Sequence, residues 1–146
     1  MKPKNIIPGL LIAITVFFFS RGCEKIAKPK DYKDFAEDYC TCFNESTASI
    51  SEEAKQIFIN SDPSNPEKMA MAYLTGEITE EDLEKIENAE TCIDELMENY
   101  GDLKTRDSEE EVIRKMLDAM DQNAKCEFTL AITRIGLEAQ NNPDFN

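Results

Sequence analysis

Residues 31–43, DYKDFAEDYCTCF, decide the fold of this chain. Four aromatic side chains in this stretch, Tyr32, Phe35, Tyr39 and Phe43, recur at the three- and four-residue spacing of one helix face. This spacing predicts an amphipathic α-helix whose apolar face is largely aromatic. The same stretch also carries two cysteines separated by a single residue, so it holds part of the predicted core and one end of each predicted disulfide.

The helical pattern continues beyond this stretch. Ile50, Ala54 and Ile57 extend the apolar face, which predicts a helix over residues 31–60. The middle of this helix, residues 46–51 (STASIS), is weak, and we expect a bend near 47–50. Ser49 followed by Glu52 is a candidate cap for the second piece.

Helical patterns also fill the rest of the chain, and no strand pattern is found. A helix after Asn65-Pro66 is expected to end at Gly76, because glycine favours helix C-termini. Thr79 and Asp82 resemble a capping box that opens a helix over 80–100. Ser108 caps a last helical region that continues to residue 139. The expected buried stripe of that region is Ile113, Met116, Leu117, Met120 and Ala124.

Two pairs of cysteines are expected to form disulfides. Cys40 and Cys42 point about 200° apart on a helix, so they cannot bond to each other without unwinding it. Each must reach either Cys92 or Cys126, and both of these pairings remain open. Cys126 would point away from the apolar stripe of a straight helix, so we predict a break near residues 121–123. The expected architecture is an all-α bundle of four to five helices stapled by two disulfides.

The N-terminal segment has the pattern of an export signal. Lys2 and Lys4 precede the apolar run 6–19, and Gly22-Cys23 follows it. Gly22-Cys23 resembles the lipobox of bacterial lipoproteins, although Ser20 stands where Leu is usual. The resemblance implies that the peptide before Cys23 is removed and that the new N-terminal cysteine carries acyl chains. We therefore expect four segments: a signal peptide or membrane anchor (1–22), a tether (23–30), a helical domain (31–140) and a polar tail (141–146).

The net charge of the chain limits the classes of partner that it is expected to bind. Residues 1–22 contain three basic and no acidic residues, which leaves 13 basic and 30 acidic residues and a net charge of −17 from Cys23 onward. Nucleic acid and anionic lipid both require a basic surface, so the charge argues against them. It favours either plain solubility, which is the preferred interpretation, or a cationic protein as a partner.

Candidate sites for catalysis and for metals are weak. The chain has no histidine, which removes the usual general base and the commonest metal ligand. Zinc sites made of four cysteines usually show two C-x-x-C pairs, and this chain has one C-x-C and two isolated cysteines. Met69, Met71, Met116 and Met120 are interpreted as core filler. We expect no enzyme activity, no cofactor and no metal.

The body resembles small Gram-negative envelope lipoproteins of unassigned function. The resemblance is carried by Cys40-Thr41-Cys42, Cys92, Tyr100-Gly101 and Cys126, although Glu127 stands where Pro is expected. It supports the helical fold and a location in the bacterial cell envelope.

The expected function is therefore a non-enzymatic binding or structural role of an exported, lipid-anchored protein. One concrete version is an immunity-type protein whose acidic face meets a cationic toxin. The alternative, a thiol-based metal-binding or redox protein, requires free thiols, whereas an oxidising compartment favours disulfides.

Overall fold

The computed structural model describes residues 25–26, 28–65, 67–89, 91–92, 96, 103–104 and 107–141. Within these residues the chain is built from α-helices and one short strand pair, so the all-α fold class is confirmed. The elements with described bounds are β1 (Lys25–Ile26), α2 (Pro29–Ser46), α3 (Glu52–Ile59), α4 (Glu67–Thr75), α5 (Glu80–Asn88), β2 (Leu103–Lys104), α7 (Glu109–Asp121), the 3-10 helix η1 (Ala124–Cys126) and α8 (Glu127–Asn141).

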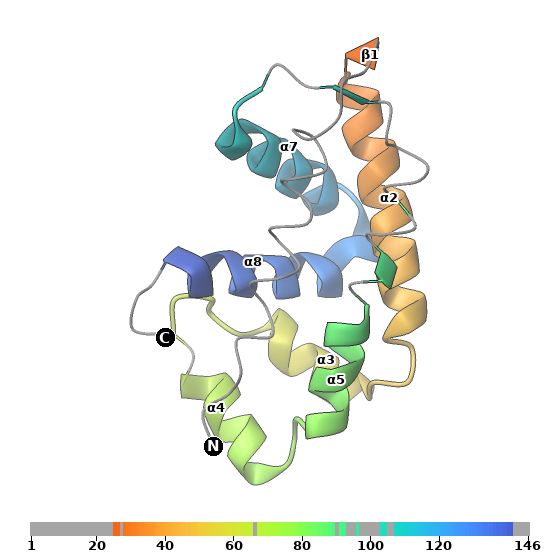
Figure 1. Cartoon of the computed structure of the whole chain (residues 1–146). Coiled ribbons are helices and arrows are strands. Elements are labelled where there is room, and N and C mark those ends of the chain that lie inside the picture. Colours follow the sequence, from red (N-terminus) through yellow and green to blue (C-terminus); the bar gives the residue numbers. More distant parts are fainter. Residues whose placement is uncertain are drawn as a thin grey trace.

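Helix α2 is the element around which the others are arranged (Figure 1). α7 lies beside its N-terminal half, and α8 begins against the middle of α2 and runs away from it. α3 packs against α8, while α5 contacts α2 near the C-terminal end of α2. α4 lies at the far end of the molecule from α7, and its main contacts are with α3. The molecule therefore has a well-packed middle and one sparsely packed helix at an end.

The aromatic face of α2 forms the centre of the core, as its spacing predicts. Tyr39 and Phe43 are fully buried, and their ring centroids lie 5.9 Å apart. Phe128 of α8 lies 5.9 Å from Phe43, and Phe58 of α3 lies 5.9 Å from Phe128. These tilted and edge-on geometries are the ones that aromatic quadrupoles favour. A continuous set of rings thus joins α2, α3 and α8.

The predicted helix over 31–60 is two helices, α2 and α3, with a break between them. The buried Thr47 donates its hydroxyl proton to the Phe43 carbonyl over 2.7 Å and caps the end of α2. Ser51 then opens α3, because its Oγ accepts a hydrogen bond from the Ala54 N–H over 3.1 Å. The prediction that Ser49 caps this second piece is wrong. Ser51, and not Ser49, is the N-cap, and it has the extended backbone that this position requires.

Three other predicted helix ends agree with the structure, whereas the predicted helix over 80–100 is wrong in its length, because α5 ends at Asn88 with Ala89 as its C-cap. α4 is followed by Gly76, whose φ of +79° lies in the left-handed region that favours glycine. Thr79 and Asp82 form a reciprocal capping box at the start of α5. Ser108 caps α7 by accepting from the Glu111 N–H. In each case hydrogen bonds between residues close in sequence satisfy backbone groups that the helix itself leaves unpaired.

The predicted break near residues 121–123 is confirmed, while part of the predicted stripe is wrong. α7 ends at Asp121, and Asn123 caps η1 by accepting from the Lys125 N–H over 3.1 Å. The stripe of α7 is rotated relative to the prediction, because Val112 is fully buried and Ile113 only partly. Ala124 is exposed, since it lies beyond the end of α7 on the turn that reorients the chain.

The N-terminal edge of the helical body begins slightly earlier than expected. α2 starts at Pro29, and the Lys28 N–H donates to the Asp31 carboxylate over 2.6 Å. β1 pairs in parallel with β2, so two residues expected in the tether are paired with a distant part of the chain. Residues 1–22 and Cys23 lie outside the described residues. Among the described helices, none has the length and apolar character needed to cross a membrane.

Candidate functional site

All four cysteines of the helical body are joined in two disulfides. Cys40 is bonded to Cys126, with a Cα–Cα distance of 5.1 Å, and Cys42 is bonded to Cys92, with a Cα–Cα distance of 5.7 Å. This is one of the two pairings that the sequence analysis left open. The two sulfur atoms of the C-x-C motif leave α2 on different sides, so one helix is linked to η1, directly before α8, and to the region after α5.

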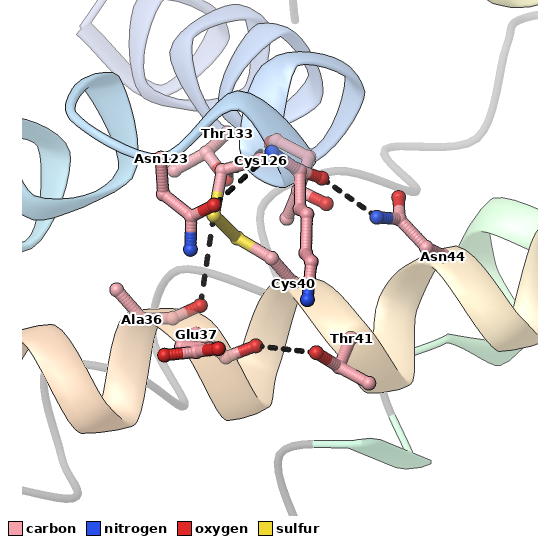
Figure 2. The surroundings of a disulfide bond; sticks show 10 residues. Ala36, Glu37, Cys40, Thr41, Asn44, Asn123, Cys126 and Thr133 are labelled. Atoms are coloured by element: carbon pink, nitrogen blue, oxygen red, sulfur yellow. Dashed lines mark hydrogen bonds between the residues drawn. A yellow bond between two sulfur atoms is a disulfide. The ribbon is translucent and has the colours of Figure 1, made fainter.

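The Cys40–Cys126 disulfide is buried between α2 and η1 (Figure 2). Cys126 Sγ lies 3.7 Å from the Ala36 carbonyl oxygen, and this contact is buried. At the edge of the site the Asn44 amide donates to the Lys125 carbonyl over 2.6 Å. The break at 121–123 thus turns Cys126 inward, and Asn44 holds the turn against α2.

The Cys42–Cys92 disulfide closes the other side of α2. Cys92 is fully buried and its N–H donates to the Ala89 carbonyl over 3.1 Å. Ser46 Oγ lies 3.5 Å from Cys92 Sγ, and the hydroxyl must be the donor because the bonded sulfur carries no proton. Both bonds consume the sulfur atoms that thiolate chemistry would need.

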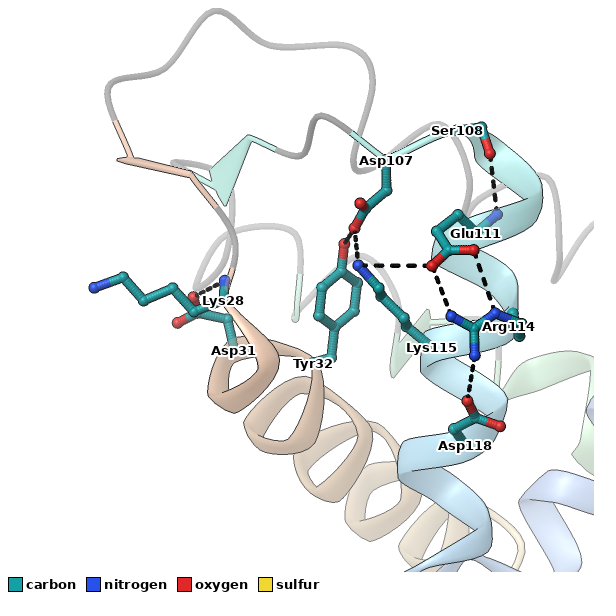
Figure 3. Close-up of polar contacts among 9 residues, drawn as sticks. All are labelled: Lys28, Asp31, Tyr32, Asp107, Ser108, Glu111, Arg114, Lys115 and Asp118. Carbon is teal, nitrogen blue, oxygen red and sulfur yellow. Dashed lines mark hydrogen bonds and ion pairs between the residues drawn. The ribbon is translucent and has the colours of Figure 1, made fainter.

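A polar cluster joins the N-terminal end of α2 to α7 (Figure 3). Tyr32 donates its phenolic proton to Asp107 Oδ2 over 2.8 Å, and Lys115 donates to the same oxygen over 2.6 Å. Lys115 Nζ also lies 5.6 Å from the centroid of the Tyr32 ring. The Asp107 and Lys115 side chains are 25% and 35% exposed, so water screens this pair only partly. The cluster acts as a polar clamp between two helices.

The acidic first turn of α7 is occupied by an ion-pair network. Arg114 donates to the Glu111 carboxylate over 2.6 Å and to Asp118 over 2.9 Å. The hydrogen bond from Arg114 lowers the pKa of the Glu111 carboxyl, and the same bond raises the pKa of Arg114. Opposite charges three and four residues apart thus pair along the surface of α7, and such pairs stabilise a helix.

Other acidic groups singled out by sequence have structural roles. Asp82 accepts from the backbone N–H of Thr79 over 2.9 Å and from its hydroxyl over 2.7 Å. No cluster of three or more potential metal-ligating side chains occurs among the described residues. The acidic runs therefore provide caps and surface charge in the part of the chain that the structure describes.

One surface feature is absent from the sequence analysis. Met71, Tyr73 and Leu74 of α4 are 58%, 47% and 77% exposed, and they are the large apolar side chains classed as exposed among the described residues. The interpretation of Met71 as core filler is wrong, because α4 buries Ala72 and part of Met69 instead. The signal was available, since α4 carries apolar residues all round whereas a surface helix normally keeps a polar face.

Comparison of the chain with protein-family models, with curated proteins and with solved structures gave no match.

Proposed function

We propose that this chain is an exported, lipid-anchored protein of the bacterial cell envelope with a non-enzymatic binding or structural role. The observation that carries the proposal is the pair of disulfides, Cys40–Cys126 and Cys42–Cys92. Disulfides persist in oxidising compartments and are rare where glutathione and thioredoxin keep thiols reduced. The apolar run 6–19 followed by Gly22-Cys23 supplies the matching export and acylation signal.

The pairing of the body cysteines also bears on the alternative role in thiol-based metal or redox chemistry. That role requires thiolates, and the four sulfur atoms of the body are bonded in pairs. Cys23 is the remaining cysteine of the chain. Its place at the end of the apolar run supports acylation as its role.

Metabolic labelling tests the proposal. The full chain is expressed in a Gram-negative bacterium supplied with an alkyne analogue of palmitate, and the label is detected after purification. We expect the wild-type protein to be labelled, to fractionate with membranes and to begin at Cys23. The Cys23→Ala variant should carry no label.

The Cys42→Ala/Cys92→Ala variant is the matched control, because it removes cysteines from the body and leaves the anchor intact; it should keep its label. Label that persists in Cys23→Ala, or a wild-type protein found in the cytosol with free thiols, would contradict the proposal.

A further inference from the structure

We propose that the exposed face of α4 is a docking surface for a basic amphipathic helix of a partner protein. Met71 and Leu74 are three residues apart, so their side chains are neighbours on one face of α4. Tyr73 flanks them, and all three are more than 40% exposed. We define these three side chains as the α4 ridge. This inference rests on the proposed binding role and names the surface that performs it.

The position of α4 leaves this face open. Helix α4 packs mainly against α3, and Ala72 is its buried residue. Helix α4 therefore buries only a narrow part of its surface, and the side chains of the α4 ridge remain exposed to solvent. Exposed apolar side chains that gather on one element mark interaction sites more often than scattered ones do.

The charges around the α4 ridge indicate which kind of partner it binds. Glu67 lies one helical turn before Met71 on the same face. Glu77 follows the helix, and its carboxylate accepts a hydrogen bond from the Thr75 hydroxyl over 3.1 Å, which places it at the C-terminal end of α4. Carboxylates therefore flank the α4 ridge at both ends. The basic residue of α4, Lys68, is directed toward the loop after α3, since its Nζ lies 3.4 Å from the Asn60 carbonyl oxygen.

The backbone of α4 adds to this negative field. The last turn of the helix contains no basic residue, so the partial negative charge of its C-terminus is not compensated by α4 itself. α5, the next helix along the chain, carries the exposed residues Glu80, Glu81 and Glu84, of which Glu81 is paired with Lys85 over 2.8 Å. A second copy of this chain would bring like charges together, and anionic lipid would be repelled. A helix with apolar anchors and basic flanks matches both parts of the surface.

The test uses the full chain in nanodiscs of zwitterionic phosphatidylcholine. The probe is an 18-residue amidated peptide of Leu and Lys whose Leu residues all fall on one helix face, and empty nanodiscs measure its binding to lipid. We expect Met71→Ser/Leu74→Ser to weaken peptide binding about tenfold or more, as truncation of apolar anchors does. Glu67→Gln/Glu77→Gln should weaken it severalfold and reduce its dependence on salt.

The matched control is Glu45→Gln/Glu110→Gln, which removes the same charge from exposed positions on α2 and α7 and should leave binding unchanged. Circular dichroism establishes that each variant is folded. Equal weakening by the control variant, or no effect of Met71→Ser/Leu74→Ser, would overturn the inference. A wild-type protein that does not bind the peptide would also overturn it.

Sedimentation tests the remaining outcome. A wild-type dimer that Met71→Ser/Leu74→Ser dissociates would overturn the inference, because the α4 ridge would then bind a second copy of the chain. None of these failures affects the labelling result at Cys23, so the two proposals fail separately.

Discussion

Asp107 is the residue through which α7 is fastened to the N-terminal end of α2. One carboxylate oxygen accepts from both Tyr32 and Lys115 (Figure 3). Hydrogen bonds to ionised groups are stronger than those between neutral groups, and partial burial protects these from solvent. Asp107 therefore contributes more to the stability of the fold than its position in a loop suggests.

We predict that Asp107→Asn lowers the free energy of unfolding by about 1 kcal/mol, because the charge that holds Lys115 is lost. Urea denaturation followed by circular dichroism measures the change. Asp118→Asn is the matched control, since Asp118 also bonds a basic side chain but is 57% exposed, and its effect should stay below about 0.5 kcal/mol. Equal effects of the two variants would show that the clamp contributes nothing beyond a surface ion pair.

Glu111 gives a prediction about pH. Its pKa in the folded protein is lowered from 4.5, chiefly by the hydrogen bond from Arg114. A carboxyl with a lowered folded pKa stabilises the protein above its unfolded pKa, and this contribution is lost as the pH falls through the folded value. Titration of the Glu111 side-chain carbonyl by NMR should give a pKa below 4.5. In Arg114→Gln the pKa should rise toward the ordinary value, and an unchanged pKa would contradict this cause.

At the scale of single elements, Gly76 determines how α4 ends. Its φ of +79° is costly for any residue with a Cβ, while a Cβ built there meets no atom within 4 Å. The cost of a substitution is therefore a backbone cost alone. We predict that Gly76→Ala lowers the free energy of unfolding by about 1 kcal/mol.

Gly76→Asn serves as the control for that substitution, because asparagine tolerates the left-handed region better than alanine does. Chemical denaturation of the two variants should give a smaller loss for Asn. A loss that is equal in both, or larger for Asn, would mean that something other than φ limits this position.

Three helix ends were predictable from sequence because each depends on a short-range signal, whereas the end of α5 at Asn88 carries no such signal. The Thr79–Asp82 box, the Ser108 cap and the Gly76 stop each involve residues within one turn of one another. The choice between Ser49 and Ser51 was less accessible. Both serines precede acidic residues, and the buried end of α2 at Thr47 decides where the chain can turn.

The orientation of α4 could not be predicted from its own sequence. Nearly every position of the helix is apolar or small, so periodicity gives no single inward face. Its contact with α3 selects Ala72 for burial and leaves Met71 exposed. The sequence pattern therefore indicated an apolar helix with a surplus of apolar side chains, while tertiary packing decided which of them stay exposed.

At the scale of the whole molecule, the two disulfides determine how far the helices can separate. They close sequence separations of 86 residues (Cys40–Cys126) and 50 residues (Cys42–Cys92). Helix geometry predicted that the cysteines of the C-x-C motif must bond elsewhere. It left the choice of partner open, because that choice depends on the path of the chain between α2 and α8.

We predict that removing either bridge destabilises the protein by about 4–5 kcal/mol, through the larger conformational entropy of the unfolded chain. The Cys40→Ala/Cys126→Ala variant should lose about 0.5 kcal/mol more than Cys42→Ala/Cys92→Ala, since it opens the longer loop. Thermal and urea unfolding of both variants measure the difference. Retention of wild-type stability by either variant would contradict the prediction that this bridge is a staple.

The pairing of the four body cysteines is the claim on which the fold, the compartment and the proposed function all depend. Mass spectrometry of the native protein, alkylated without reduction and then digested, measures it directly. Because Thr41 alone separates the two cysteines of α2, one peptide carries both, and partial reduction with stepwise alkylation is needed to assign each bond. We predict four masked thiols joined as Cys40–Cys126 and Cys42–Cys92. Alkylated body cysteines in the native protein, or a bond between Cys40 and Cys42, would contradict the account.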